Sequence, residues 1–297
     1  MTDAASAQLA PGALFPPHVL HYHLHRIKEA RRTAALPSGT CNPVPPVLAL
    51  ATAKACDPAL WFVLDEFADA SGRFLSICGK ETCANSTMNV RDTHGGNTHQ
   101  FTARPEQAAH FRIVLRNSVL PAGPVRRVCE IGFNAGHSAA LWLEGTQSQV
   151  EHVVSFDMLD HPYSAAMQQL LTALYGEKRI SWHGGDSTKT VAAFAARVAS
   201  GEEPPCDLWY IDGGHGPVVA ADTVNALKSS YNGTIVLWDD CTRKWKSPLE
   251  AYRSQLAAGT IRHSSALPTK IYMKASGNGF CAALANVSRT RPSLRNR

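Results

Sequence analysis

The sequence predicts an α/β fold in which helices cover a mostly parallel, Rossmann-like sheet. Two observations carry this prediction. From Val125 onward, short apolar runs alternate with segments of helical periodicity, which is the pattern of repeated βαβ units. Two further apolar runs then flank the turn residues 276–279, and this arrangement predicts a carboxy-terminal antiparallel hairpin.

Each element of the predicted sheet follows from an apolar run of strand length. We expect strands at residues 125–132, 152–158, 180–186, 207–212 and 234–240. The intervening segments have helical spacing of their apolar residues. We expect helices at about 136–143, 164–175, 190–200, 218–230 and 248–258. The predicted domain runs from residue 120 to 285.

Residues 1–119 form a predicted amino-terminal extension that is mainly helical and partly flexible. Within it we expect a basic helix over about 18–35, a proline-rich joint at 37–46 and a helical stretch near 58–70. The polar, glycine-bearing stretch 93–100 is a predicted loop. It is a candidate lid, although an ordinary surface loop accounts for it equally well. The lid candidates of the extension contain Trp61, Phe62 and His94, and the sequence does not indicate which acceptor they would face.

The net charge of +5 is concentrated at the end of the chain. Without the four arginines of the predicted basic, flexible tail 286–297, the chain holds 25 basic and 24 acidic residues. A nearly neutral body disfavours a nucleic-acid partner, because polyanion binding needs clustered cations. We therefore expect the tail to be solvated.

Three further features bound the class of protein. The chain has no apolar run of about 18 residues, so we expect no membrane span. The amino-terminal residues lack the pattern of a secretory signal, which favours a cytoplasmic protein. The eight cysteines show no paired CxxC motifs, so we expect reduced structural thiols and no zinc site.

A glycine motif follows the first predicted strand. It reads Glu130-Ile-Gly132-Phe-Asn134-Ala-Gly136-His-Ser138 and leads into a helix. It resembles the E/D-x-G-x-x-x-G motif of the class I S-adenosylmethionine (SAM) dependent methyltransferases, and the resemblance extends over about residues 120–285. It implies a seven-stranded sheet and a SAM site. The missing Cβ atoms of the glycines would let the backbone approach the cofactor. A dinucleotide site would prefer G-x-G-x-x-G, and any tight strand-to-helix turn is the plainer alternative.

The next strand ends carry polar residues suited to the rest of this cofactor. Asp157 ends the second strand, where the resemblance implies a carboxylate that accepts the ribose hydroxyls. Gly185, Asp186 and Ser187 follow the third strand, where the family places contacts to adenine, and Asp212 follows the fourth. Open α/β sheets bind ligands at the carboxyl ends of their strands, so these positions are mutually consistent.

Three carboxylates and a histidine follow the fourth and fifth strands. Asp212, Asp239 and Asp240 would repel one another in a partly buried site unless a cation or protons compensated them, and Mg²⁺ or another divalent cation prefers oxygen ligands. The set resembles the metal-dependent small-molecule O-methyltransferases of the catechol, caffeoyl-CoA and macrolide-sugar types. That resemblance implies that the three aspartates bind the metal and that His215 is the general base.

The predicted function is transfer of a methyl group from SAM to a hydroxyl of a small molecule, either a sugar or a phenol-like compound. One alternative is a nucleic-acid methyltransferase, but the sequence IDGGH stands where amino-methylating enzymes carry N/D-P-P-Y/F. A second alternative is a non-catalytic SAM-binding protein. The sequence leaves the acceptor open, and it neither requires nor excludes a homo-oligomer.

Overall fold

The computed structural model describes residues 14–33, 123–144, 150–161, 164–265, 267, 270–272 and 279–292. The chain divides into two compact units. Unit 1 consists of Met1–His110, Asn134–Gln147 and Leu159–Arg179, and unit 2 of Phe111–Phe133, Ser148–Met158 and Ile180–Arg297. The predicted boundary at residue 119 and the expectations for 37–46, 58–70 and 93–100 lie outside the described residues.

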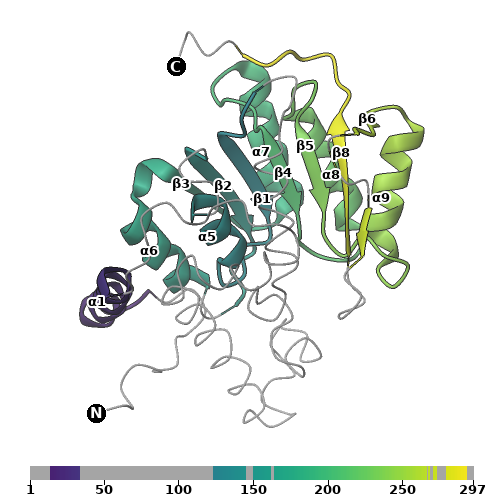
Figure 1. The fold of residues 1–297 in the computed structure, drawn as a ribbon. Coiled ribbons are helices and arrows are strands. Elements are labelled where there is room, and N and C mark those ends of the chain that lie inside the picture. The colour runs from purple at the N-terminus through teal and green to yellow at the C-terminus, as the bar shows by residue number, and fades with distance from the viewer. Residues whose placement is uncertain are drawn as a thin grey trace. The chain divides into compact units, whose positions relative to one another are not determined.

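Unit 2 contains an eight-stranded sheet with the order β3-β2-β1-β4-β5-β8-β6, and Figure 1 shows its strands in this order from left to right. Its five parallel strands are β1 (Arg127–Ile131), β2 (His152–Asp157), β3 (Ile180–Gly184), β4 (Leu208–Ile211) and β5 (Ile235–Trp238). The antiparallel strand β8 (Gly279–Ala285) follows β5, and it pairs on its other edge with β6 (Ile261–Arg262) and β7 (Lys270–Tyr272).

The predicted fold class is confirmed by this topology. Each predicted parallel strand is present, and it begins and ends within two residues of its predicted limits. The β7–β8 pair is the predicted hairpin. The two-residue strand β6 was not predicted, because it is too short to leave an apolar pattern of its own.

Three helices pack along one face of the sheet: α7 (Ser187–Ser200), α8 (Val218–Lys228) and α9 (Lys246–Ala257). The core under them takes alternate residues from the central strands, such as Cys129 and Ile131 from β1 and Trp209 and Ile211 from β4. The residues between them are buried as well, so β4 and β5 are buried along their whole length. Burial on both faces explains why these strands appear in the sequence as continuous apolar runs.

Unit 1 contains α1 (Pro17–Thr33), α5 (His137–Glu144), α6 (Ser164–Tyr175) and a short 3-10 helix, η2 (Glu177–Arg179). The backbone N–H of Phe15 donates to Oε1 of Gln169 in α6 over 2.9 Å. In α1, His23 is buried while His21 and His25 are exposed, as expected if the three do not share a face. None of the helices in the described part of the chain is long and apolar enough to cross a membrane.

The segment after β8 is held against unit 2, which differs from the solvated tail expected for residues 286–297. Arg291 donates to Oδ1 of the buried Asp207 over 2.8 Å. The same carboxylate accepts hydrogen bonds from the backbone N–H groups of Arg126 and Arg127 and from the hydroxyl of Tyr231. A buried carboxylate requires such compensation, and Arg291 supplies the positive charge. Residues 293–297 lie outside the described residues.

Two disulfides lie inside unit 2, Cys129–Cys206 and Cys241–Cys281. The first joins β1 to the residue two positions before β4, and the second joins the loop after β5 to β8. The expectation of reduced thiols is therefore wrong for these four cysteines. Disulfides of this kind are uncommon in the reducing cytosol.

Candidate functional site

The predicted site falls where the strand order of unit 2 reverses. Strand β1 pairs with β2 on one side and with β4 on the other. In open α/β sheets, the carboxyl ends of the strands at such a point form the ligand-binding crevice. Backbone hydrogen bonds continue past the strand ends: the N–H of Gly132 donates to Phe156 over 2.8 Å, and the N–H of Asp212 donates to Ile131 over 2.9 Å. The residues that follow each strand are thereby fixed relative to one another.

Gly132 is required by its neighbouring strand. Its φ of +98° is in the region that favours glycine, and a Cβ built there would overlap the backbone carbonyl oxygen of Asp212. Sequence reasoning explained this glycine by the approach of a cofactor. The structure adds a second reason, which is the close approach of the β1 and β4 chain ends.

Two carboxylates of the predicted cofactor site accept hydrogen bonds from other groups of the protein. Glu130 is fully buried in β1, and the Ser155 hydroxyl donates to its Oε1 over 2.9 Å. Oδ2 of Asp157 accepts the backbone N–H of Phe133 over 2.7 Å, which ties the end of β2 to the glycine loop. Their contacts to the cofactor stay predictions.

The second half of the glycine motif belongs to unit 1. Asn134 has a φ of +52°, and its carbonyl oxygen accepts the Ser164 hydroxyl over 2.7 Å. Gly136 has a φ of +84°, and its carbonyl oxygen accepts the N–H of Ala140 over 2.9 Å as α5 begins. Ser138 is buried in the first turn of that helix.

The residues after β3 start a helix. Gly185 has a φ of +114°, and its N–H donates to the Asp157 carbonyl over 2.8 Å. Asp186 is the N-cap of α7: its Oδ1 accepts the Thr188 hydroxyl over 2.7 Å and the Thr188 N–H over 3.0 Å, and these bonds lower the pKa of Asp186. Ser187 is the first residue of the helix. Sequence reasoning missed the capping role, although an aspartate directly before a helical run indicates it.

The acidic residues after β4 and β5 influence one another. The Tyr210 hydroxyl donates to Oδ2 of Asp212 over 2.9 Å. Burial, and then the charges of Asp239 and Asp240, raise the pKa of Asp212 well above its ordinary value, and the Tyr210 bond opposes this rise. Burial and the charge of Asp212 also raise the pKa of Tyr210. The structure thus brings together the three predicted carboxylates.

His215 is paired with one of these carboxylates. Its Nε2 lies 2.8 Å from Oδ2 of Asp240, a buried residue with a φ of +48° that few non-glycine residues adopt. The imidazole also contacts Trp245, with 4.5 Å between ring centroids. Such positive φ angles are often found at functional sites, where the surrounding structure maintains them.

The donor chemistry of this cluster suits a hard divalent cation. Oδ1 of Asp212 is shielded from solvent and receives no well-formed hydrogen bond from the described residues, and the carboxyl groups of Asp239 and Asp240 lie close enough to raise its pKa. In their present positions, however, no three His, Cys, Asp or Glu side chains of the described chain are arranged to hold a metal ion. Tyr210 and His215 each engage an oxygen that a ligand set would use.

A further buried carboxylate, Asp222 in α8, was not predicted. It is fully buried, and neither of its oxygens receives a well-formed hydrogen bond from the described residues. A Cβ on Gly213, in the loop after β4, would lie 3.7 Å from its Oδ2. Burial raises the pKa of Asp222 to about 6, an effect that the Ser187 hydroxyl opposes. An aspartate within a helical run carries no signal that would reveal such a position.

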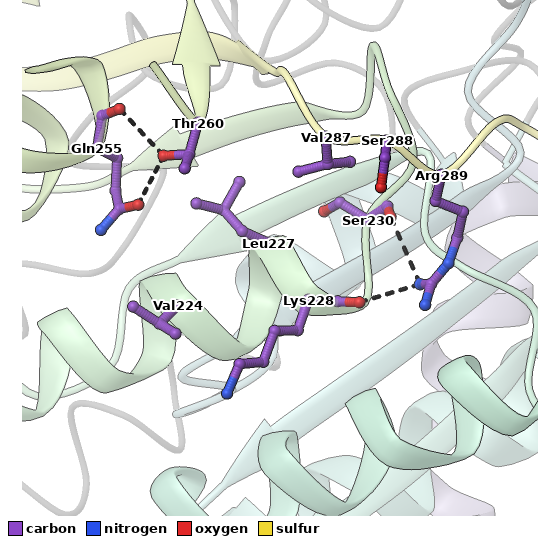
Figure 2. A pocket seen from close by; sticks show the side chains of 9 residues that line it. All are labelled: Val224, Leu227, Lys228, Ser230, Gln255, Thr260, Val287, Ser288 and Arg289. Carbon is purple, nitrogen blue, oxygen red and sulfur yellow. Dashed lines mark hydrogen bonds between the residues drawn. The ribbon is translucent and has the colours of Figure 1, made fainter. Parts of the chain in front are cut away.

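A pocket of about 320 Å³ lies apart from all these residues, beside the carboxyl end of α8, the end of α9 and the segment after β8 (Figure 2). None of the predicted site residues lines it. Arg289 donates to the carbonyl oxygens of Lys228 over 3.0 Å and Ser230 over 3.5 Å, as Figure 2 shows. These contacts satisfy carbonyl groups at the end of α8, which explains the arginine structurally.

Residues 129–241 match the model of a family described as a methyltransferase domain. The match covers less than half of the 297-residue chain. Its limits enclose the strand ends described above, from the glycine motif to the acidic pair after β5. Among curated proteins, no sequence matches this chain.

Solved structures give three similarities. A putative O-methyltransferase from Klebsiella pneumoniae has a TM-score of 0.49 at 14% identity, covering 90% of this chain and 100% of that one. The O-methyltransferase from Bacillus cereus, in complex with S-adenosylhomocysteine (SAH), has a TM-score of 0.47 at 16% identity, covering 73% of this chain and 91% of that one. The O-methyltransferase TomG from Streptomyces achromogenes, in complex with SAM, has a TM-score of 0.46 at 16% identity, covering 73% of this chain and 90% of that one.

These TM-scores lie below 0.5, so the assignment depends on the family match and on the sheet described above. That sheet has five parallel strands, an antiparallel strand next to the last of them and a glycine turn after the first. Residues 129–241 therefore match a methyltransferase domain, and the order of strands in the sheet resembles that of the class I SAM-dependent methyltransferases.

Proposed function

We propose that the protein transfers the methyl group of SAM to a hydroxyl oxygen of a small molecule, with His215 as the general base. The observation that carries the proposal is the 2.8 Å contact between His215 and Asp240, beside Asp212 and Asp239 at the carboxyl ends of β4 and β5. An imidazole held by a carboxylate beside a ligand crevice suits proton abstraction near neutral pH.

The cofactor would lie across the strand ends. In this proposal Glu130 lies near its methionine portion, Asp157 accepts its ribose hydroxyls, and Gly185, Asp186 and Ser187 contact its adenine. The turn residues Gly132, Asn134, Gly136 and Ser138, together with Asp212, complete the set. The position of Asp157 supports its proposed role at the ribose, because it ends β2 and its side chain accepts a hydrogen bond from the glycine loop.

The reaction is a displacement at carbon. The acceptor hydroxyl oxygen attacks the SAM methyl carbon, a C–O bond forms, the bond between that carbon and sulfur breaks, and SAH leaves. The hydroxyl proton passes to His215. When Nε2–H of His215 donates to Asp240, the lone pair that accepts the proton is on Nδ1. Asp240 then holds the ring in one orientation and stabilises the imidazolium that forms.

Asp212, Asp239 and Asp240 would hold a divalent cation such as Mg²⁺. When bound, the cation would supply positive charge opposite the developing alkoxide or phenolate. The burial of Asp212 and the nearness of the Asp239 and Asp240 charges, which together raise its pKa, support this part of the proposal, because a bound cation would offset both effects. Nδ1 of His215 is a separate atom from the oxygen ligands, so the histidine can act with the cation in place.

The test compares His215→Ala, His215→Gln and Asp240→Asn with the wild type, each with and without added Mg²⁺. SAH release is measured over a panel of sugar and phenol acceptors, and SAH binding is measured by calorimetry. Loss of the general base should lower turnover by about 10²–10⁴-fold and leave SAH affinity nearly unchanged. Loss of SAH binding in the histidine variants would assign His215 a structural role. Unchanged turnover would refute its role as the base.

A further inference from the structure

The segment that joins the acidic pair to α9 lies beside the proposed base. It consists of residues 241–246, and its Trp245 contacts the His215 ring. Nζ of Lys244 lies 5.2 Å from the centre of the Trp245 ring. These contacts place Trp245 and Lys244 on the side of His215 that faces the segment, so in the proposed reaction they would lie near the acceptor.

The segment carries uncompensated positive charge. Arg243, Lys244 and Lys246 are exposed, and we call them the cationic rim. Among the described residues, no carboxylate forms an ion pair with any of the three. The first turn of α9 contains no acidic residue, and Lys246 stands there instead, at the end of the helix whose dipole is positive. A cation at this end of a helix is unfavourable by itself, and an anion bound there would offset the effect.

We propose that the acceptor carries an anionic group, a carboxylate or a phosphate, which pairs with the cationic rim while its hydroxyl lies at His215. This inference rests on the proposed function and names its substrate class. The rim would supply long-range attraction and orientation, and the buried acidic residues would act on the hydroxyl. Trp245 connects the two, because it contacts both His215 and the Lys244 ammonium.

Other arginines of unit 2 show why a small anion fits better than a polyanion. Arg126 pairs with Glu151, Arg127 with Glu203 and Arg291 with Asp207, each at 2.8 Å. A nucleic acid requires cations spread along its backbone, whereas the rim belongs to one short segment. The short length of the rim therefore suits one anionic group better than an extended polyanion.

The test measures binding of two probes to protein saturated with SAH. Protocatechuate carries a carboxylate on the same dihydroxylated ring as catechol, so the pair isolates the charge. Calorimetry is run on the wild type, Arg243→Gln, Lys244→Gln and the matched control Lys228→Gln, which removes an exposed cation at the other end of the strands. Saturation with SAH is itself a checkpoint, because failure to bind SAH counts against the proposed function and not against the rim.

The expected result is tighter binding of protocatechuate than of catechol in the wild type. Each rim substitution should weaken the binding of protocatechuate by up to about fivefold, since exposed ion pairs are of this strength. The affinities for catechol and for SAH should stay unchanged. A higher salt concentration should weaken the binding of protocatechuate more than that of catechol. Equal affinity for the two probes, binding of neither, or an effect of Lys228→Gln equal to the rim variants would overturn the inference.

Discussion

Replacing Asp222 by Asn should make the stability of the protein less dependent on pH. The folded state raises the pKa of this carboxyl from 3.8 to about 6, chiefly by burial. A raised pKa means that the folded state favours the neutral form. The stabilising contribution of the neutral carboxyl is complete below pH 3.8 and is lost as the pH rises through about 6.

The magnitude follows from the difference between the two pKa values. The difference between a pKa of 3.8 in the unfolded state and about 6 in the folded state corresponds to at most roughly 3 kcal/mol of unfolding free energy. Asn has nearly the same shape and carries no charge at any pH. The stability of Asp222→Asn relative to the wild type should therefore increase between about pH 4 and pH 7 by up to this amount and then become constant.

The assay is urea unfolding at several pH values, followed by tryptophan fluorescence, with the m-value checked for constancy. A constant offset between the proteins can arise from the amide itself, so the pH-dependent part of the difference is the observable. Asp186→Asn is the matched control, because hydrogen bonds from Thr188 lower the pKa of Asp186 from 3.8. Its stabilising contribution is present above pH 3.8 and is lost only at lower pH, so its difference from the wild type should stay nearly constant from pH 4 to 8. Parallel stability curves for wild type and Asp222→Asn from pH 4 to 8 would refute the reasoning.

Three other predictions concern contacts of unit 2. Gly132→Ala should lower the free energy of unfolding by about 3 kcal/mol or more in the same urea assay. Gly233 has the same φ of +98°, but a Cβ added there would meet nothing within 4 Å, so Gly233→Ala should cost only about 1–2 kcal/mol. Equal costs would remove the clash with Asp212 as the cause. Arg291→Gln should cost about 3 kcal/mol, since it leaves the Asp207 charge buried without its cation, and a neutral result would show that the remaining donors suffice. Thiol alkylation of the unfolded protein followed by mass spectrometry should find both disulfides intact until a reductant is added, and complete alkylation without reductant would contradict the pairing.

The sheet could be predicted from the sequence because its signals are local. Strands β1, β2, β4 and β5 are buried along most or all of their length, so each leaves a short apolar run, and the glycines after β1 interrupt the chain at a turn. The polar strand ends were found for the same reason. In parallel strands their carboxyl ends share one edge, so their order along the chain was enough to group Asp157, Asp212 and Asp239.

The side-chain pairings could not be predicted, because they depend on register and long-range packing. Arg291 and Asp207 are 84 residues apart, and Cys129 and Cys206 are 77 apart. The pairing of His215 with Asp240 depends on the unusual backbone angle of Asp240, which no local pattern indicates. Sequence reasoning therefore assigned this carboxylate only to a metal, whereas the structure also gives it a contact with the base.

Titration of the purified protein with SAH by isothermal calorimetry tests the central claim most directly, which is the proposal that the strand ends of unit 2 bind the SAM nucleoside. The account predicts stoichiometric binding by the wild type. It also predicts that Asp157→Asn binds about tenfold more weakly, because it removes a charged acceptor of the ribose hydroxyls while its amide oxygen can keep the Phe133 N–H bond. Absence of SAH binding by the folded wild type, or equal affinity of the two proteins, would contradict it.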